Sequence, residues 1–140
     1  MLISCWSVKG GSGTTVVSAA IALELARLAT GPCFLADLSG DLPAALGLPE
    51  PDGPGLTDWV EAGPAVRADA FDRMAIDVAG SLRLLPLGTA AETACGEGLA
   101  AALAGLGTVI ADCGTPRPGS TGWAVTAGAD HSLLANIRKE

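Results

Sequence analysis

One glycine-rich run, Lys9-Gly10-Gly11-Ser12-Gly13-Thr14-Thr15, decides the fold. Before it, residues 1–8 form an apolar segment typical of a buried strand; after it, residues 15–29 are typical of a helix that is apolar nearly all round. Glycines between a strand and a helix let backbone N–H groups converge on one point, and the helix adds its positive dipole end. The run therefore predicts a phosphate-binding loop, with all seven of its residues as candidate ligands of a nucleotide.

The rest of the chain continues to alternate between strands and helices. Apolar strands are expected at residues 33–37, 81–86, 108–112 and 131–134, and helices at 43–46, 58–61, 64–74, 89–104 and 122–128. This alternation predicts an α/β fold, a single P-loop NTPase-like domain over residues 1–140 with a doubly wound, mostly parallel sheet of about four to five strands. Hydrophobic residues make up 49% of the chain and charged residues 16%, as expected when helices cover both faces of a sheet.

The overall charge argues against nucleic acid as a partner. The formal net charge is −7, and the eight Lys and Arg residues are dispersed except for Arg138 and Lys139. Such a surface repels a phosphate backbone, so we expect no nucleic-acid binding through this chain. No apolar run reaches the roughly 20 residues of a membrane span. No basic segment precedes an apolar stretch as in a signal peptide, so we expect a soluble, cytoplasmic protein.

The four cysteines, Cys5, Cys33, Cys95 and Cys113, show none of the short spacings of a zinc or redox motif. Three of them lie in or beside apolar strand-like runs, where a thiol packs as a small hydrophobe. We interpret them as reduced, buried thiols, and the alternative is a metal site shared across a dimer axis.

Two of the predicted strands end in an aspartate, Asp37 and Asp112. In α/β sheets, ligands bind beyond the carboxyl ends of the strands, where these two side chains would lie. The hydroxyl of Thr15, in the first helical turn, is placed to ligate Mg²⁺. We therefore predict a magnesium site made by Thr15, Asp37 and Asp112. The alternative is that the two aspartates only cap strand ends.

The glycine run resembles the deviant Walker A motif, K-G-G-x-G-K-[ST], of the MinD/ParA group of P-loop ATPases. Lys9, Gly10, Gly11, Gly13 and Thr15 fit that motif. Further segments resemble the family in the same order along the chain: the strand end and switch I at residues 34–41, a short helix entry at 55–60, a strand at 82–87, Walker B at 109–112 and switch II at 113–116. Together these segments cover almost the whole chain.

This resemblance implies ATP and Mg²⁺ as cofactors and a homodimer that closes around two nucleotides. It implies that Lys9 reaches across the dimer to the nucleotide of the partner, and that a protein activator or scaffold stimulates slow hydrolysis. Members of the group organise cells in space: they partition chromosomes and plasmids, position the division septum, or place flagella and pili. The resemblance therefore implies a dimerising switch of this kind.

Three departures from the family pattern bear on catalysis. Thr14 stands where the family has the lysine that contacts the phosphates, and Ser39 stands where it has the water-positioning aspartate. Asp41 could replace that aspartate only if its loop shifts. Family members are also longer, so we expect a shortened form of the fold.

These departures leave enzymatic activity open, and no residue is assigned as catalytic. We expect ATP binding with weak or no hydrolysis. The alternative is a non-catalytic structural or interaction module that self-associates, or docks a partner, without nucleotide. An enzyme of another class finds no support, since no nucleophile and base are paired by pattern, and His131 is expected at the surface.

Overall fold

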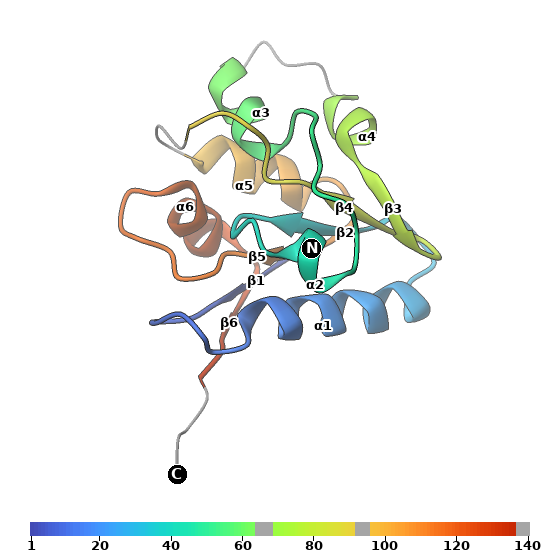
Figure 1. The fold of residues 1–140 in the computed structure, drawn as a ribbon, viewed down its shortest axis with the longest axis horizontal. Coiled ribbons are helices and arrows are strands. Elements are labelled where there is room, and N and C mark those ends of the chain that lie inside the picture. The colour runs from blue at the N-terminus through green and yellow to red at the C-terminus, as the bar shows by residue number, and fades with distance from the viewer. Residues whose placement is uncertain (64–68, 92–95, 137–140) are drawn as a thin grey trace.

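Strands and helices alternate along the chain in the computed structural model, which describes residues 1–63, 69–91 and 96–136 (Figure 1). The elements are β1 (Leu2–Trp6), α1 (Thr14–Leu28), β2 (Cys33–Asp37), α2 (Leu42–Ala45), α3 (Leu56–Ala62), α4 (Ala70–Met74), β3 (Ile76–Ala79), β4 (Leu82–Leu85), α5 (Glu97–Ala104), β5 (Thr108–Asp112), α6 (Thr121–Gly128) and β6 (His131–Leu134). The expected α/β architecture is confirmed.

The strands form one sheet in the order β3-β4-β2-β5-β1-β6. Every neighbouring pair is parallel except β3 and β4, which form an antiparallel hairpin at one edge. The sheet has six strands where about four to five were expected, and β3 is the additional one. Its sequence, Ile76-Asp77-Val78-Ala79, alternates half-buried and exposed residues over only four positions, so it carries a weak apolar signal.

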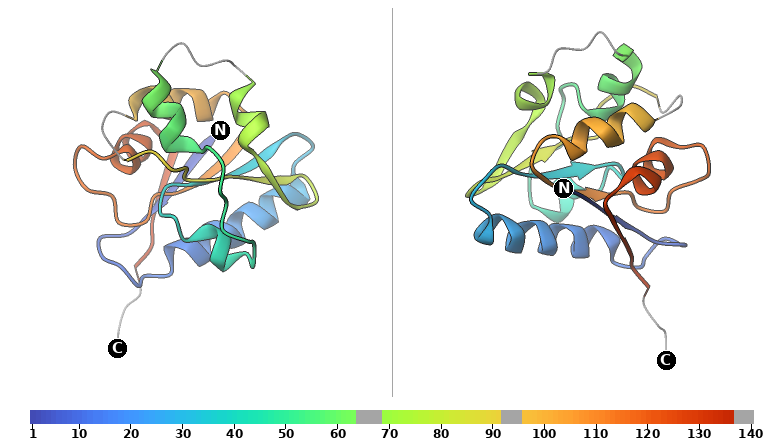
Figure 2. Two further views of the ribbon diagram at one scale, coloured as in Figure 1. Left: turned by 45° about the horizontal axis from the view of Figure 1, so that its top comes forward. Right: turned by 180° about the vertical axis from the view of Figure 1, so that it is seen from behind.

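The apolar strand sequences follow from burial on both faces of the sheet. In β2, Phe34 and Ala36 pack in one core cluster, whereas Cys33 and Leu35 pack in the other. Because successive side chains of a strand point to opposite faces, a strand covered on both sides needs an uninterrupted apolar run. Helices α1 and α2 contribute to the second cluster, and α3, α5 and α6 lie over the opposite face (Figures 1 and 2).

Helix α1 begins at Thr14, inside the glycine run and one residue before the expected start. Its N-cap is Gly13, in the left-handed region at φ 76°, and no side chain caps it. The small residues Ser18, Ala19 and Ala22 form its buried side, so the helix axis lies close to the sheet. The first turn of α1 therefore leaves its backbone N–H groups free at the carboxyl edge of the sheet.

The other expected helices are placed with shifted ends. Helix α3 begins at Leu56 rather than Asp58, with Gly55 as its N-cap. For the helix expected at 64–74, residues 64–68 lie outside the described part, and α4 covers only Ala70–Met74. For the helix expected at 89–104, residues 89–91 are not helical, residues 92–95 lie outside the described part, and α5 covers Glu97–Ala104.

The thiols of Cys5, Cys33 and Cys113 are buried and free, as expected, and Cys95 lies outside the described residues. Burial raises the pKa of all three thiols, that of Cys113 to about 12. They are therefore protonated and act as packing groups. Among helices of the described residues, none has both the length and the apolarity needed to cross a membrane.

Strand β6 forms the other edge of the sheet, and β1 is its only partner among the strands of the described residues. All four of its residues are exposed, including His131, Leu133 and Leu134. On the inner side, the Ser132 hydroxyl accepts hydrogen bonds from the Trp6 indole N–H at 2.8 Å and the Ser4 hydroxyl at 3.2 Å. These bonds fix the strand against β1, and no strand of the described part pairs with its outer edge.

Candidate functional site

A cavity of about 590 Å³ lies where β1, β2 and β5 reach their carboxyl ends. This volume falls in the roughly 300–1,000 Å³ range of small-ligand sites. Its described lining comes from the loops that follow these strands, from the first turns of α1 and α6, from α3, and from the loop after β4. The lining residues are Ser7, 10–16, 38–39, Asp41, Thr57, Leu87, Ala90, 113–117 and 120–122.

The glycine run forms one wall of this cavity. Residues 10–15 line it, whereas Lys9 is exposed and lies outside the lining. The hydroxyls of Ser7 and Ser12 both donate to the Lys9 carbonyl, at 3.0 and 2.8 Å, and hold the loop in shape. A Cβ atom added at Gly10 or Gly11 would meet no atom of the chain within 4 Å. The space in front of this backbone is therefore open.

Thr14 and Thr15 present their side chains at the start of α1. Thr14 is only 6% exposed, yet its Oγ1 atom has no hydrogen-bond partner among the described residues. A buried hydroxyl without a partner costs about 1–3 kcal/mol. Since Thr14 lines the cavity, a ligand oxygen there would supply the missing bond. Thr15 also lines the cavity and is half-buried.

Asp37 and Asp112 lie together at the ends of β2 and β5, joined through Ser39. The Ser39 hydroxyl lies 2.8 Å from Asp112 Oδ2 and 3.1 Å from Asp37 Oδ1. Both aspartates are buried, and neither lines the cavity, whereas Ser39 does. The predicted magnesium ligands are therefore divided: Thr15 is at the cavity wall and the two carboxylates lie beneath Ser39.

The buried carboxyl of Asp37 is incompletely satisfied. Its Oδ1 accepts the backbone N–H groups of Ser39 and Gly40, at 3.1 and 2.8 Å, but its Oδ2 has no partner among the described residues. Burial raises the pKa of Asp37, the bonds from Gly40 and Ser39 partly offset the rise, and the charge of Asp112 adds to it. No cluster of three or more His, Cys, Asp or Glu side chains in the described part could hold a metal by itself.

Asp58, on α3, holds the opposite wall of the cavity. Its carboxylate accepts four bonds at 2.8–3.1 Å: the backbone N–H groups of Gly55, Thr89 and Ala90, and the Thr89 hydroxyl. Desolvation acts to raise the pKa of Asp58, but these bonds outweigh it and hold the pKa below its ordinary value. Asp58 thus fixes the loop that carries the lining residues Leu87 and Ala90.

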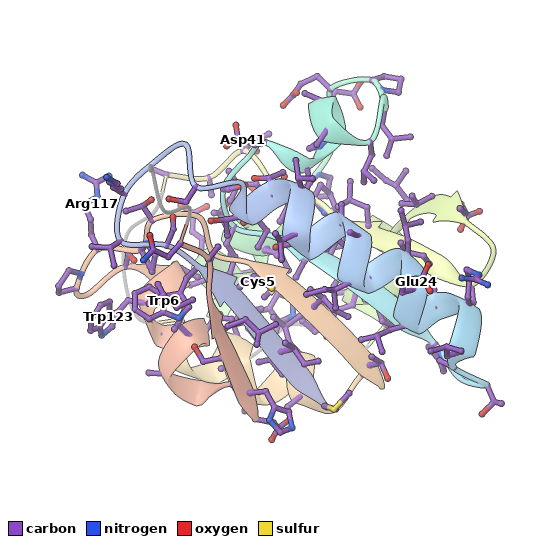
Figure 3. All side chains as sticks on the ribbon, turned by 90° about the horizontal axis from the view of Figure 1, so that it is seen from below. Cys5, Trp6, Glu24, Asp41, Arg117 and Trp123 are labelled. Atoms are coloured by element: carbon purple, nitrogen blue, oxygen red, sulfur yellow. The ribbon has the colours of Figure 1, made fainter. Side chains whose placement is uncertain are left out.

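The loop after β5 closes the cavity from the remaining side. It is tied to the end of β1, since the Ser7 N–H donates to the Gly114 carbonyl at 2.8 Å and the Ser7 and Thr115 hydroxyls lie 3.2 Å apart. Among described lining residues, only Asp41 and Arg117 carry charge. Figure 3 shows Arg117 and Asp41 on either side of the loop that joins β1 to α1.

Residues 10–15 of the predicted glycine run line the cavity, whereas Lys9 lies outside its lining. The sequence did not single out Ser7, Asp58 or Arg117 as candidate site residues. Asp58 falls inside the helix-entry segment already singled out, at residues 55–60. Arg117 directly follows the segment that resembles switch II, 113–116, so extending that segment by one residue would have found it.

Comparison with solved structures shows what this fold is similar to. A ParA family ATPase from Chlorobium tepidum matches with a TM-score of 0.73 and 20% identity, over 95% of this chain and 59% of that chain. McdA from Cyanothece matches as the apo protein and as an ATP complex, with TM-scores of 0.69 and 0.68 and 19% identity. A plasmid partition protein from Borrelia burgdorferi matches with a TM-score of 0.59 and 16% identity. The expected MinD/ParA-like fold is therefore confirmed.

The chain spans 55–63% of the length of these neighbours while 95–96% of it is matched. No protein-family model and no curated protein sequence matches it. At this level of identity the likeness establishes the fold.

Proposed function

We propose that this chain is a MinD/ParA-like nucleotide-binding protein that takes ATP with Mg²⁺ into the cavity beside the glycine run. The observation that carries the proposal is the buried, unpartnered hydroxyl of Thr14, in a loop with open space before its glycines. The fold supports it too, since the neighbours include ATPases and a protein in complex with ATP.

The backbone of residues 10–15 would bind the phosphates through its N–H groups, assisted by the positive end of α1. The hydroxyl of Thr14 would donate to a phosphate oxygen, and the hydroxyl of Thr15 would ligate Mg²⁺. Bound Mg²⁺ would supply neutralisation of the phosphate charge. Asp37 fits a supporting role for the metal, because its unpartnered Oδ2 is an acceptor still free to bind. Asp112 would support the same site from beside it, since the Ser39 hydroxyl lies between the two carboxylates.

We expect hydrolysis to be weak or absent. Thr14 has no charge to stabilise a transferring phosphoryl group, and loss of one positioned donor typically costs about 3 kcal/mol of transition-state stabilisation. Ser39, in place of the water-positioning aspartate, already shares its hydroxyl with Asp37 and Asp112. Asp41 reaches the cavity lining, but its side chain is exposed to solvent.

The cellular role that we propose is a homodimeric switch in spatial organisation, such as chromosome partitioning or the positioning of a septum, pilus or flagellum. Lys9 is exposed and outside the cavity of its own chain, so it is available to a nucleotide held by a second copy. A protein activator or scaffold would then act on the dimer.

Thermal unfolding with and without Mg-ATP tests the binding proposal. Free Mg-ATP at a concentration of 100 times its Kd would stabilise the folded protein by about 2.7 kcal/mol and raise the Tm. Sedimentation in the same buffers would report a shift from monomer to dimer. If saturating Mg-ATP left the Tm and the oligomeric state unchanged, the alternative would replace the proposal: a structural or interaction module that works without nucleotide. The observation that favours this alternative is the Ser39 hydroxyl, which is already shared by Asp37 and Asp112.

Hydrolysis has a separate test. The double variant Thr14→Lys, Ser39→Asp should raise the rate of ATP turnover above wild type, because it restores the two side chains on which the family's chemistry depends. Each single variant is the matched control. A double variant that bound Mg-ATP and turned it over no faster would show that catalysis lacks more than these two groups.

A further inference from the structure

The charged side chains of the cavity lining would not neutralise the phosphates of a bound nucleotide. A nucleoside triphosphate carries several negative charges, but the described lining offers one cation, Arg117, and one anion, Asp41. Thr14 contributes a hydroxyl only, and Lys9 lies outside the lining of its own chain. The positive charge that the phosphates need within one chain can therefore come from Arg117.

The guanidinium of Arg117 is free to take this role. It is exposed and makes no ion pair or side-chain hydrogen bond with any residue that the structure describes. By contrast, Arg27, Arg73 and Arg83 each pair with an acidic side chain. Arg117 is thus a cation at a cavity mouth with its hydrogen-bond donors uncommitted.

The backbone that carries Arg117 is fixed relative to the glycine run. Ser7 bonds to Gly114 and Thr115 in the Arg117 loop, and its hydroxyl also donates to the Lys9 carbonyl. The Arg117 carbonyl accepts the Ser120 N–H at 3.0 Å, where α6 begins. Only the side chain needs to turn, so little backbone ordering would oppose its binding to a phosphate.

We propose that Arg117 binds the phosphates of the nucleotide and supplies, from the loop after β5, the charge that Thr14 does not supply from the glycine run. The inference rests on the nucleotide-binding function proposed above. Guanidinium binds phosphate through paired N–H groups, and such charge-assisted bonds are stronger than neutral ones. The ligand would therefore bridge two loops of the cavity, and its affinity would depend on its number of phosphates.

Isothermal titration of purified wild type, Arg117→Gln and Arg27→Gln with Mg-ATP tests this inference. Arg117→Gln should weaken binding about tenfold or more. Arg27→Gln removes the same charge from the far end of α1, breaks only an exposed pair with Glu24, and should bind as wild type does. Inorganic tripolyphosphate, as a competitor that has phosphates alone, should lose affinity for Arg117→Gln by a similar factor.

The outcomes separate the two proposals. If wild type binds no Mg-ATP, the nucleotide function itself fails. If wild type binds and Arg117→Gln binds equally well, the function stands and the role of Arg117 is refuted. Weaker ATP binding with unchanged tripolyphosphate competition would also refute it, since Arg117 would then act on the nucleoside. The slope of log affinity against log salt concentration should fall in Arg117→Gln, which a merely structural loss would not produce.

Discussion

Two glycine-bearing walls face each other across the cavity, and their glycines serve opposite purposes. In the glycine run, a Cβ added at Gly10 or Gly11 would meet nothing. In the wall held by Asp58, a Cβ at Gly55 would overlap the Pro86 carbonyl, and a Cβ at Gly88 would overlap the Asp58 carboxylate. The second wall needs glycine for its own packing, whereas the first keeps open a space that the chain itself does not fill.

From this contrast we expect the largest loss of folding stability when Gly88 is replaced. The residue has φ +99°, and an alanine there would place Cβ against Asp58 Oδ2 and 2.8 Å from Thr57 Oγ1. Gly88→Ala should therefore lower the free energy of unfolding by about 3 kcal/mol, from backbone strain and overpacking together. Urea denaturation measures this loss.

Gly80→Ala is the matched control for Gly88→Ala. Gly80 also has a positive φ, +56°, but an added Cβ meets nothing within 4 Å. Only the backbone strain remains, about 1 kcal/mol. Equal losses at the two glycines would mean that Asp58 does not require the close approach of Gly88.

The next effect concerns Asp58 itself. Asp58→Ala removes four hydrogen bonds to a partly solvated carboxylate and should cost about 1–2 kcal/mol at pH 7. Asp52→Ala, an exposed aspartate on the preceding loop, should cost almost nothing. Chemical denaturation of both variants measures the difference, and equal costs would remove Asp58 from its proposed role.

The effect of Asp58 should depend on pH in a defined direction. Its pKa in the folded state lies below the ordinary value of 3.8, so its stabilisation is fully present above that value. As the pH falls through the folded pKa, the carboxylate is protonated and the stabilisation is lost. The stability gap between wild type and Asp58→Ala should therefore narrow below pH 3.8. A constant gap would contradict this assignment.

On the open wall, Gly10→Ala should leave the fold unchanged. Gly10 is not among the glycines with positive φ, and its added Cβ is free of contacts. The free energy of unfolding should stay within roughly 0.5 kcal/mol of wild type. The added methyl would instead crowd a bound phosphate, so the rise in Tm caused by Mg-ATP should shrink. A full ligand-induced rise in this variant would place the phosphates elsewhere.

The smallest effect that we expect is the chemical reactivity of the thiol of Cys113, which also lines the cavity. This thiol is 4% exposed, and burial raises its pKa to about 12, so almost no reactive thiolate forms near neutral pH. Alkylation mapped by mass spectrometry should leave Cys5, Cys33 and Cys113 unmodified in the native protein and modify them in urea. Rapid native labelling of Cys113 would show that the cavity floor opens.

The parts of this molecule that sequence predicts well are those whose signal is local. The glycine run fixed the position of β1, α1 and one cavity wall, because each of its features acts within a few residues. The strands that are buried on both faces were predicted equally well from their apolar sequences, since neighbouring residues such as Phe34 and Leu35 pack in cores on opposite faces of the sheet. The short, half-polar β3 was missed, as its pairing with β4 depends on tertiary contacts more than on its own sequence.

The other cavity wall was less predictable because its determinants are distant in sequence. The sequence of residues 89–91 predicts the start of a helix. In the structure, the backbone N–H groups of Thr89 and Ala90 instead donate to the carboxylate of Asp58, which lies about thirty positions earlier in the chain. Likewise, the aspartates Asp37 and Asp112 end their strands as expected, yet Ser39 covers them from the cavity. Which side of a loop faces a cavity depends on partners that no local pattern reveals.

The open edge of the sheet has a consequence that amide hydrogen exchange can follow. Within the described part of the chain, strand β6 pairs on one side only, and all four of its residues are exposed, whereas β5 lies between β1 and β2. Deuterium should therefore enter the sheet from the β6 side, first at amides that point away from β1, and reach β5 only when the whole domain opens. A binding partner that covered this edge would slow amide exchange at β6 alone. The position of its binding surface would then be known even before the partner itself was identified.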